Sequence, residues 1–336
     1  MGCGVVADYG HIPAILRTPG LELSALFDPD PGRLRAASEK FGVRAAFTDQ
    51  ERFLDEPLDA VVVASPAWAH RDNVLAAAAR GLHVLCEKPI AMLDTEAEAM
   101  IEAMKAAGRM LLAGFVYRFS PVAQQIRQWI RESAVGEIRS LRLIYIWDLH
   151  GRYEMLPNGS WIESPRWVGR MEEGGPLVDC GVHQIDLARW WLGSEVVRSR
   201  AFGAWVADYE APDHVYLHMD HERGEHTAIE VSFTYWHTAR EPQAQFSYDL
   251  IGSGGVLRYD RNGYILEART GDGVIRVPGA SEKNFPGMYT ALAEVLERGA
   301  PGDFPTAEDA LIATQIARTA TDEVIRARIE RPKRAK

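Results

Sequence analysis

Two short segments contain residues whose types and spacing could perform acid–base chemistry. Glu87, Lys88 and Pro89 follow a short apolar run, and Asp179 and His183 lie four positions apart further along the chain. A histidine can accept a proton near neutral pH, and a neighbouring carboxylate orients it and favours its charged form. On a helix, the four-residue spacing places both side chains on one face. A surface lysine, a helix cap and a partly buried histidine remain open as simpler interpretations.

The chain opens with the pattern G-x-G-x-x-A, in which Gly2, Gly4 and Ala7 are the small residues. In a dinucleotide-binding turn the first glycine allows a tight turn, the second lets the backbone approach a pyrophosphate, and the third small residue lets helix and strand pack closely. Asp28 ends the next apolar run, where a carboxylate can accept both ribose hydroxyls and repel a 2′-phosphate. The pattern therefore favours NAD over NADP, although Asp28 also fits turn and cap chemistry.

One feature conflicts with a complete nucleotide-binding turn. Only Met1 precedes Gly2, whereas such a turn follows a strand that is central in a doubly wound sheet. Without that strand, its two neighbours are expected to have unpaired backbone groups. Either the sequence starts several residues too late, or this form binds the cofactor poorly. We favour the first explanation because the rest of the pattern is intact, and upstream residues could also include an export signal.

Composition restricts the class of protein. A length of 336 residues suggests two domains, and 47% hydrophobic with 25% charged residues is typical of globular proteins. The net charge of -10 argues against a nucleic-acid partner. Three cysteines without a C-x-x-C spacing favour a reducing, cytoplasmic location over a disulfide framework. No apolar run is long enough to span a bilayer, and too few ligands cluster for us to expect a metal site.

The pattern of apolar residues changes near residue 118. Before it, short apolar runs alternate with helical stretches, which indicates a parallel sheet covered on both faces. Strands are predicted at 22–27, 60–64, 83–86 and 110–115, and helices at 31–41, 73–80 and 95–107.

After a connecting helix at 122–131, strand-like runs follow with few helices between them, which indicates a largely antiparallel sheet. These strands are predicted at 137–147, 198–206, 215–220, 227–236 and 245–251, and closing helices at 288–298 and 307–326. We therefore predict an α/β protein. Residues 1–118 would form a Rossmann-type doubly wound parallel sheet with a truncated first strand. Residues 119–330 would form an α+β domain with a large, mostly antiparallel, open-faced sheet.

These segments together resemble the glucose–fructose oxidoreductase, inositol dehydrogenase and MocA (Gfo/Idh/MocA) family over nearly the whole chain. The similar motifs are the opening glycine turn, Ser65-Pro66 with His70, Glu87-Lys88-Pro89, and the run Gly174 to His183 with Asp186. One departure is Pro176, which replaces the third glycine of the family's G-G-G and is tolerated in the first turn of a helix.

The resemblance implies a dehydrogenase or reductase that moves a hydride between nicotinamide and a hydroxyl or carbonyl of a sugar, sugar derivative or cyclitol. Lys88 would stabilise the developing alkoxide, His183 would take the hydroxyl proton, and Asp179 would hold substrate and lysine in register. The residues implied to line the cofactor are Gly2, Gly4, Ala7, Asp28, Ser65, Pro66, His70, Glu87 and Lys88. The resemblance also implies a cis Lys88–Pro89 bond and a homodimer or homotetramer formed through the open sheet face.

Substrate contacts are harder to predict. Aromatic rings and guanidinium groups suit polyhydroxylated rings, and the candidates are Arg118, Trp161, Arg166, Trp167, Trp236 and His237. Each of them could instead be a packing or surface residue. Two other functions also stay open. One is an enzyme that cleaves glycosidic bonds through transient oxidation while NAD is recycled, and the other is a non-catalytic sugar- or nucleotide-binding relative.

Overall fold

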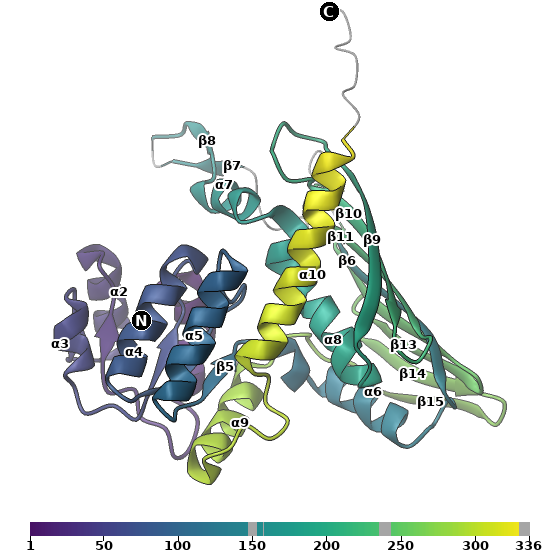
Figure 1. Cartoon of the computed structure of the whole chain (residues 1–336), viewed down its shortest axis with the longest axis horizontal. Helices are drawn as coiled ribbons and strands as arrows, with labels where there is room; N and C mark the ends of the chain where they lie inside the picture. The colour runs from purple at the N-terminus through teal and green to yellow at the C-terminus, as the bar shows by residue number, and fades with distance from the viewer. Residues whose placement is uncertain (147–152, 157, 235–242, 329–336) are drawn as a thin grey trace, which may run out of the picture. The chain divides into compact units, whose positions relative to one another are not determined.

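The computed structural model describes residues 1–146, 153–156, 158–234 and 243–328, and the chain forms two compact units. Unit 1 comprises Met1–Ala123 and Glu282–Thr314, and unit 2 comprises Gln124–Ser281 and Gln315–Lys336. Figure 1 follows the chain through both. The boundary predicted after residue 118 assigns 282–314 to the second domain, whereas the structure groups this segment with unit 1.

Unit 1 alternates short parallel strands with helices, as predicted (Figure 1). Its strands form two small sheets, β1 (Leu26–Phe27) with β2 (Ala46–Phe47), and β3 (Ala60–Val63), β4 (His83–Cys86) and β5 (Leu111–Ala113) in that order. All these pairs are parallel. The helices are α2 (Pro31–Phe41), α3 (Gln50–Leu54), α4 (His70–Ala79) and α5 (Asp94–Ala106), with 3-10 turns η2 (Ala67–Ala69) and η3 (Val116–Phe119).

The N-terminal segment lies between the two small sheets and hydrogen-bonds to both. The Gly2 amide donates to the Phe27 carbonyl at 2.8 Å, and the Ala64 amide donates to the Met1 carbonyl at 2.8 Å. The Met1 amino group donates to the Val62 carbonyl at 2.7 Å. At these residues the expectation of unpaired neighbours is wrong, because Met1 and Gly2 take the place of the end of the central strand.

A cavity occupies the position where the rest of the central strand would lie. A space of about 100 Å³ lies between β1 and β3, lined among others by Leu23, Leu26, Val61 and Val62. Burial lowers the pKa of the adjoining Met1 amino group to about 6. The predicted strand 22–27 is correspondingly reduced to the two residues of β1, since it has a partner on this side only at its carboxyl end.

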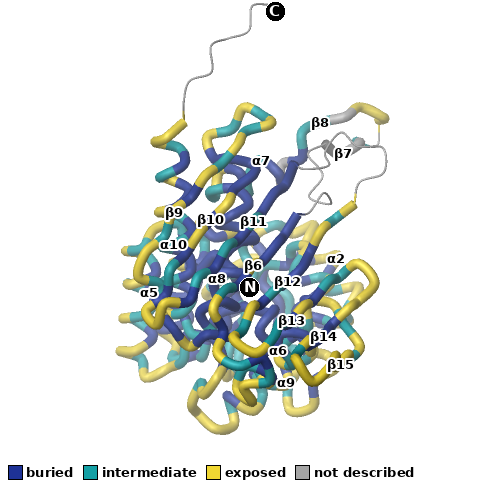
Figure 2. The backbone as a smooth tube through the Cα atoms, turned by 90° about the vertical axis from the view of Figure 1, so that its right-hand side faces the viewer, coloured by how far each residue is buried: buried dark blue, intermediate teal, exposed yellow. Residues whose placement is uncertain are grey.

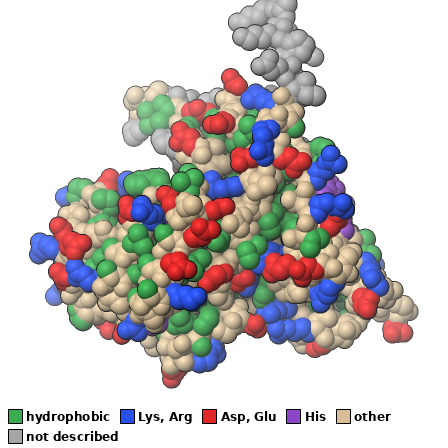
Figure 3. Space-filling model, in the orientation of Figure 1, with side chains coloured by type: hydrophobic (Ala, Val, Ile, Leu, Met, Phe, Trp, Pro, Cys, Tyr) green, Lys and Arg blue, Asp and Glu red, His purple; other side chains and the backbone are tan. Residues whose placement is uncertain are grey.

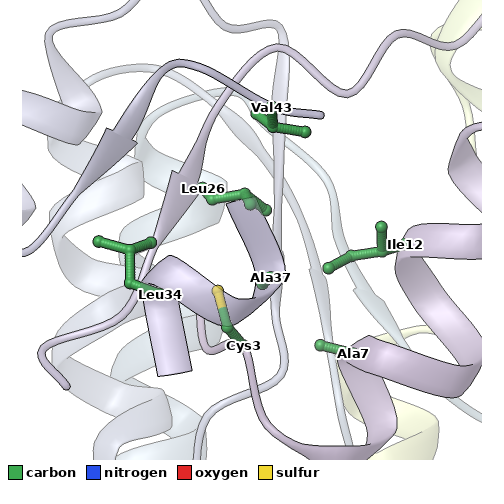
Figure 4. Packing of buried hydrophobic residues seen from close by; sticks show 7 residues of the cluster. All are labelled: Cys3, Ala7, Ile12, Leu26, Leu34, Ala37 and Val43. Atoms are coloured by element: carbon green, nitrogen blue, oxygen red, sulfur yellow. The ribbon is translucent and has the colours of Figure 1, made fainter. Parts of the chain in front are cut away.

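A cluster of buried apolar side chains holds the glycine turn in place (Figure 4). Its members come from the N-terminal segment, the π-helical turn η1 (Ala7–His11), α1 (Ile12–Ile15), β1, α2 and the turn after α2. They are Cys3, Ala7, Ile12, Leu26, Leu34, Ala37 and Val43. Because cores pack densely, this cluster fixes the path of the backbone from Gly2 into η1.

A segment from late in the chain completes unit 1. Helix α9 (Phe285–Arg298) packs against α1 and η3. Before α10 (Ala307–Arg326) begins, Thr306 forms a bridge with Leu112, and the Ala113 amide donates to the Pro305 carbonyl at 2.8 Å. The Asn284 side chain caps α9 through the Gly287 amide. The chain therefore returns to the edge of β5 after forming most of unit 2.

Unit 2 is built on one eight-stranded sheet in the order β15-β14-β13-β12-β6-β11-β10-β9. Its strands are β6 (Ile138–Ile146), β9 (Val196–Ala204), β10 (His214–His221), β11 (His226–Ser232), β12 (Gln245–Gly252), β13 (Gly255–Asp260), β14 (Ile265–Thr270) and β15 (Gly273–Pro278). Only β6 and β11 pair in parallel. The predicted large, mostly antiparallel sheet is confirmed, and β13 to β15 extend it beyond the predicted strands.

The sheet of unit 2 has one apolar and one mixed face. Along β10, the side chains of Val215, Leu217 and Met219 are buried, while the intervening Tyr216 and His218 are exposed. Figure 2 colours the backbone of the chain by burial. Helix α8 (Val182–Leu192) packs on β6 and β11. The remaining elements of this part of the chain are α6 (Pro121–Arg131), β7 (Tyr153–Met155), β8 (Trp161–Glu163), α7 (Pro165–Glu172) and the π-helical turn η4 (Leu177–Gly181).

The described helices include none with the length and apolar character needed to cross a bilayer. On the face shown in Figure 3, basic and acidic side chains are interspersed. The net charge of -10 is therefore not gathered into a single acidic field on that face.

Candidate functional site

The two glycines of the opening turn have different surroundings. Gly2 has a φ of +92°, and a Cβ there would lie 2.7 Å from the Ser65 amide nitrogen and 2.8 Å from the Ala64 carbonyl carbon. Gly2 is thus required by both backbone conformation and close approach to the loop after β3. A Cβ on Gly4 would meet no protein atom within 4 Å. The open space beside Gly4 suits a group that approaches the backbone closely, as the motif predicts.

Asp28, at the end of β1, is held against this turn. Its carboxylate accepts hydrogen bonds from the Cys3 amide at 2.8 Å and from the Asp30 amide at 2.9 Å. The side chain is buried. These bonds link the acidic residue to the G-x-G segment, and each carboxylate oxygen keeps a lone pair for a further donor such as a hydroxyl.

His70, at the start of α4, connects two predicted cofactor loops. Its Nε2 lies 2.8 Å from the Ser65 carbonyl, and its Nδ1 lies 3.1 Å from the Pro89 carbonyl and 3.2 Å from the Ile90 carbonyl. Burial lowers the pKa of His70. The Lys88–Pro89 bond is cis, as expected. The Ser65–Pro66 loop and the residues after Lys88 are therefore held to one another by one buried ring.

Glu87 fixes the main chain at Lys88. One carboxylate oxygen accepts from the Lys88 amide at 3.1 Å, and the other lies 3.0 Å from Nε2 of His11. A Cβ on Gly114 would come within 2.9 Å of Glu87 Oε1, so the glycine leaves room for the carboxylate. Lys88 is the second residue after β4, at the edge of the sheet where doubly wound proteins bind their ligands.

His11 and Tyr289 are residues that sequence reasoning missed. His11 ends the π turn η1, and its Nδ1 lies 2.7 Å from the Tyr289 hydroxyl on α9. Both side chains are buried, and burial followed by the nearby Glu87 raises the pKa of Tyr289 well above its usual range. Gly10 is the residue in the sequence that bears on this contact. A Cβ at position 10 would lie 2.6 Å from the ring of Phe285, so a larger residue there would keep α9 from packing against η1.

In unit 2, Asp179 lies within η4 and His183 within α8. The predicted four-residue spacing thus crosses from a π turn into an α-helix rather than lying within one regular helix. Both side chains are buried. Gly174 and Gly175 precede η4 with φ values of +122° and +71°, which allow the sharp entry to this turn.

Arg170, on α7, is the cation beside Asp179. Its Nε lies 3.2 Å from Asp179 Oδ2, and both side chains are largely buried. Burial works against the arginine's charge, but the neighbouring Asp179 and Cys180 raise the pKa of Arg170 overall. The Cys180 thiol also donates to Asp179 Oδ2 at 3.5 Å. The sequence offered no pattern to single out Arg170, because it precedes the recognisable motif.

The predicted substrate residues fall into two groups. Arg118 is buried and ion-paired with Asp309 at 3.2 Å, and the buried Trp167 donates its indole N–H to the Tyr209 hydroxyl at 2.6 Å. Both therefore have roles in packing, and a substrate contact stays a prediction for each. The other candidates lie outside the described residues, the first two by their side chains and the last two entirely: Trp161, Arg166, Trp236 and His237.

The residues of unit 1 fit a dinucleotide. The open position beside Gly4, the held carboxylate of Asp28 and the fixed loop at Ser65 match the turn, ribose partner and strand-end loop that such a cofactor uses. Within the residues that the structure describes, no group of three or more His, Cys, Asp or Glu side chains is arranged to hold a metal ion.

Comparison with known families decides the classification. The model of an oxidoreductase family with an NAD-binding Rossmann fold, Gfo/Idh/MocA, matches residues 1–115. The model of the Gfo/Idh/MocA C-terminal domain matches residues 123–258. The chain belongs to this family. It is therefore an oxidoreductase with an NAD-binding domain, as its glycine turn and E-K-P segment predict.

Individual Gfo/Idh/MocA relatives support the same assignment. The chain is 29% identical to the D-apiose dehydrogenase of Paraburkholderia graminis, over 81% of this chain and 69% of the relative. It is 30% identical to the D-glucoside 3-dehydrogenase of Escherichia coli, over 69% of each. The aldose–aldose oxidoreductase of Caulobacter crescentus has the same fold, with a TM-score of 0.80, 23% identity, and coverage of 98% of this chain and 97% of that one.

Proposed function

We propose that this family member is an NAD-dependent dehydrogenase or reductase acting on one hydroxyl or carbonyl of a sugar, sugar derivative or cyclitol. The observation that carries the proposal is the E-K-P segment at the end of β4. There the main chain at Lys88 is held by Glu87 and the following residues by His70. A lysine whose main chain is held at the ligand-binding edge of a doubly wound sheet is suited to bring its ammonium group to a developing alkoxide.

Lys88, His183 and Asp179 have distinct parts in this proposal. Lys88 stabilises negative charge on the substrate oxygen, and His183 takes the hydroxyl proton during oxidation and returns it during reduction. Asp179, paired with Arg170, positions the substrate and favours the charged form of the histidine. When bound, the nicotinamide ring accepts or donates the hydride at C4.

Asp28 supports NAD as the preferred cofactor. Its carboxylate stands at the end of β1, where a ribose hydroxyl is recognised and a 2′-phosphate is repelled. The neighbouring Cys3 and Asp30 amides hold it in place without neutralising it. NADP should therefore bind more weakly than NAD. Gly2, Gly4, Ala7, Ser65, Pro66, His70 and Glu87 would complete the cofactor site.

The names of the relatives support a polyhydroxylated substrate. They include the dehydrogenases of D-apiose and of D-glucosides and a scyllo-inositol 2-dehydrogenase from Bacillus subtilis. These substrates share several vicinal hydroxyls on a compact ring or chain. Arg118, Trp161, Arg166, Trp167 and His237 stay the candidate contacts for such groups.

Assembly and location are part of the same proposal. A homodimer or homotetramer would form through the outer face of the unit 2 sheet, which exposes Phe202 and Tyr216 beside charged residues. A cytoplasmic location is supported by Cys3, Cys86 and Cys180, which are all buried as free thiols and would persist in a reducing compartment.

The decisive experiment is a panel of aldoses, glycosides and inositols assayed with NAD and with NADP by absorbance at 340 nm. We expect NADH formation from at least one of them. Lys88→Ala and His183→Ala should each lower kcat by about 10²–10⁴. Lys105→Ala, an exposed lysine on α5, is the matched control and should turn over normally.

Unchanged turnover in both Lys88→Ala and His183→Ala would contradict the assignment of these residues. Cleavage of a glycoside without net change in NADH would indicate that the oxidation is transient. If NAD failed to raise the melting temperature of the protein, the cofactor itself would be in question.

A further inference from the structure

Three buried side chains from distant parts of unit 1 form a continuous hydrogen-bonded chain that ends at Lys88. It runs from Tyr289 on α9 to His11 in η1, then to Glu87 after β4, and from Glu87 to the Lys88 amide. Its distances are 2.7, 3.0 and 3.1 Å. The hydride-transfer scheme above uses neither His11 nor Tyr289.

The direction of the chain follows from the donors available. Burial and the nearby Glu87 raise the pKa of Tyr289, so its phenol stays protonated and donates to Nδ1 of His11. The opposite nitrogen, Nε2, then carries the proton and donates to Glu87 Oε1. The second Glu87 oxygen accepts from the Lys88 amide. Each member thus has a consistent role, and each bond aligns the next group along the chain.

The surrounding residues are arranged so that this chain can exist. A π turn closes its hydrogen bonds over five residues rather than four, and His11 is the last residue of η1. Gly10 leaves room for Phe285, whose ring packs edge-on to His11 at 5.1 Å between centroids. Gly114 leaves room for Glu87. Backbone and side chains from four separate segments therefore meet at one buried line of polar groups.

We propose that Tyr289 and His11 are positioning residues that act through Glu87 to fix the main chain of Lys88, so that α9 controls the geometry of the reacting ammonium group. This inference rests on the proposed role of Lys88. A displacement of about 1 Å at a reacting group can cost two orders of magnitude in rate. Loss of the Tyr289 hydroxyl should therefore reduce turnover without changing the groups that contact the cofactor.

The test compares Tyr289→Phe with Tyr259→Phe in the full-length protein. Tyr259 is also fully buried and donates its hydroxyl to the Ala280 carbonyl at 2.7 Å, but it belongs to unit 2. Both variants remove one buried hydrogen bond, so a similar decrease in melting temperature is expected. Only Tyr289→Phe should increase hydrogen exchange in the segment 84–92, by about fivefold to tenfold, measured without any ligand.

Kinetics provide a second readout. With NAD and the best substrate of the panel, Tyr289→Phe should lower kcat by about tenfold while both KM values stay within about twofold. His11→Ala should have a larger effect than His11→Gln, because the glutamine amide can still donate to Glu87. Gly114→Ala tests the position of Glu87 independently, because the added Cβ would displace the Glu87 carboxylate.

The inference is overturned if exchange at 84–92 is the same in Tyr289→Phe and Tyr259→Phe, or if Tyr289→Phe and Gly114→Ala retain wild-type kcat. Lys88→Ala distinguishes the proposed role of Lys88 from the positioning role of Tyr289 and His11. An inactive Lys88→Ala beside a fully active Tyr289→Phe refutes only the positioning role. A fully active Lys88→Ala refutes the proposed role of Lys88 and this inference with it.

Discussion

The two π-helical turns, η1 in unit 1 and η4 in unit 2, make an informative pair. Each follows closely spaced glycines and contributes buried titratable side chains, His11 from η1 and Asp179 with Cys180 from η4. Their partners differ in kind. His11 lies between a phenol and a carboxylate, whereas Asp179 faces the guanidinium of Arg170.

His11 is therefore part of a hydrogen-bonded chain, whereas Asp179 is part of an ion pair. The chain through His11 depends on which atom holds each proton, so it transmits position and direction. The pair of Asp179 and Arg170 depends on opposite charges that hold each other in a poorly solvated place. Disturbing η1 should therefore alter geometry and rate, while disturbing η4 should alter stability as well.

The largest expected effect is that of Asp179→Asn. It removes the carboxylate that pairs with the largely buried Arg170, which should lower the free energy of unfolding by about 3–5 kcal/mol. Denaturant unfolding measures this. Asp220→Asn is the matched control, because Asp220 pairs with the exposed Arg198 in the same unit and an exposed pair contributes little to stability. Equal losses in both variants would remove the distinction drawn for η4.

The glycine turn before η1 provides the next test. Gly2→Ala forces a Cβ against Ser65 at a φ of +92° and should destabilise the protein by about 1–3 kcal/mol. Gly4→Ala meets no protein atom and should leave stability unchanged, yet weaken NAD binding about tenfold by filling the space beside the turn. Thermal unfolding and NAD titration distinguish the two. An unchanged NAD affinity in Gly4→Ala would contradict the placement of the pyrophosphate.

An intermediate effect is expected from filling the cavity that precedes η1. A segment of about five apolar, β-branched residues fused before Met1 would continue the hydrogen bonds to β1 and β3 and replace the buried amino group with an amide. Filling about 100 Å³ should stabilise unit 1 by about 2 kcal/mol. A flexible Gly/Ser segment of equal length is the control. Equal melting temperatures for the two fusions would count against a strand in this space.

The smallest expected effect is a response to mild acid. In unit 2, mild acid should act through buried histidines such as His221, whose pKa is lowered by burial, as is that of His214. The unfolded chain then binds this proton first, and stability falls as the pH drops below about 6.5, by up to about 1.4 kcal/mol per pH unit. Urea unfolding at pH 7.5 and 5.5 should show a smaller decrease in His221→Gln. His218→Gln, at an exposed position, should behave like the wild type.

Much of the fold could be predicted because local patterns were strong. The helix at 31–41, the strand at 83–86 and the helix at 307–326 have the predicted bounds. Asp30 caps the first of these through two amides, and Gly42 ends it in a left-handed conformation. The E-K-P segment was found because it follows a buried strand. Strands β13 to β15 were missed, since their short alternating runs include Arg258, Glu267 and Arg276.

The partners of the candidate residues could not be predicted for physical reasons. A π turn breaks the 3.6-residue period, so no helical pattern indicated where His11 points. Tyr289 lies in α9, and the apolar pattern of this helix does not indicate which domain it packs on. The sequence therefore groups it with its neighbours in the second domain. Arg170 and Asp179 come from different elements, and they meet only once α7 and η4 have folded. Motifs identify reacting groups, while long-range contacts decide what holds them.

The late return of the chain has a consequence for biosynthesis. Residues 282–314 belong to unit 1, and Tyr289 and Phe285 among them pack on the first helix of the protein. A ribosome adds about 5–20 residues per second, so the nascent first unit waits roughly ten seconds or more with this surface exposed. Unit 2 must largely emerge during that interval. Neither unit can therefore close before the end of the chain emerges, since residues 282–314 complete unit 1 and residues 315–336 complete unit 2.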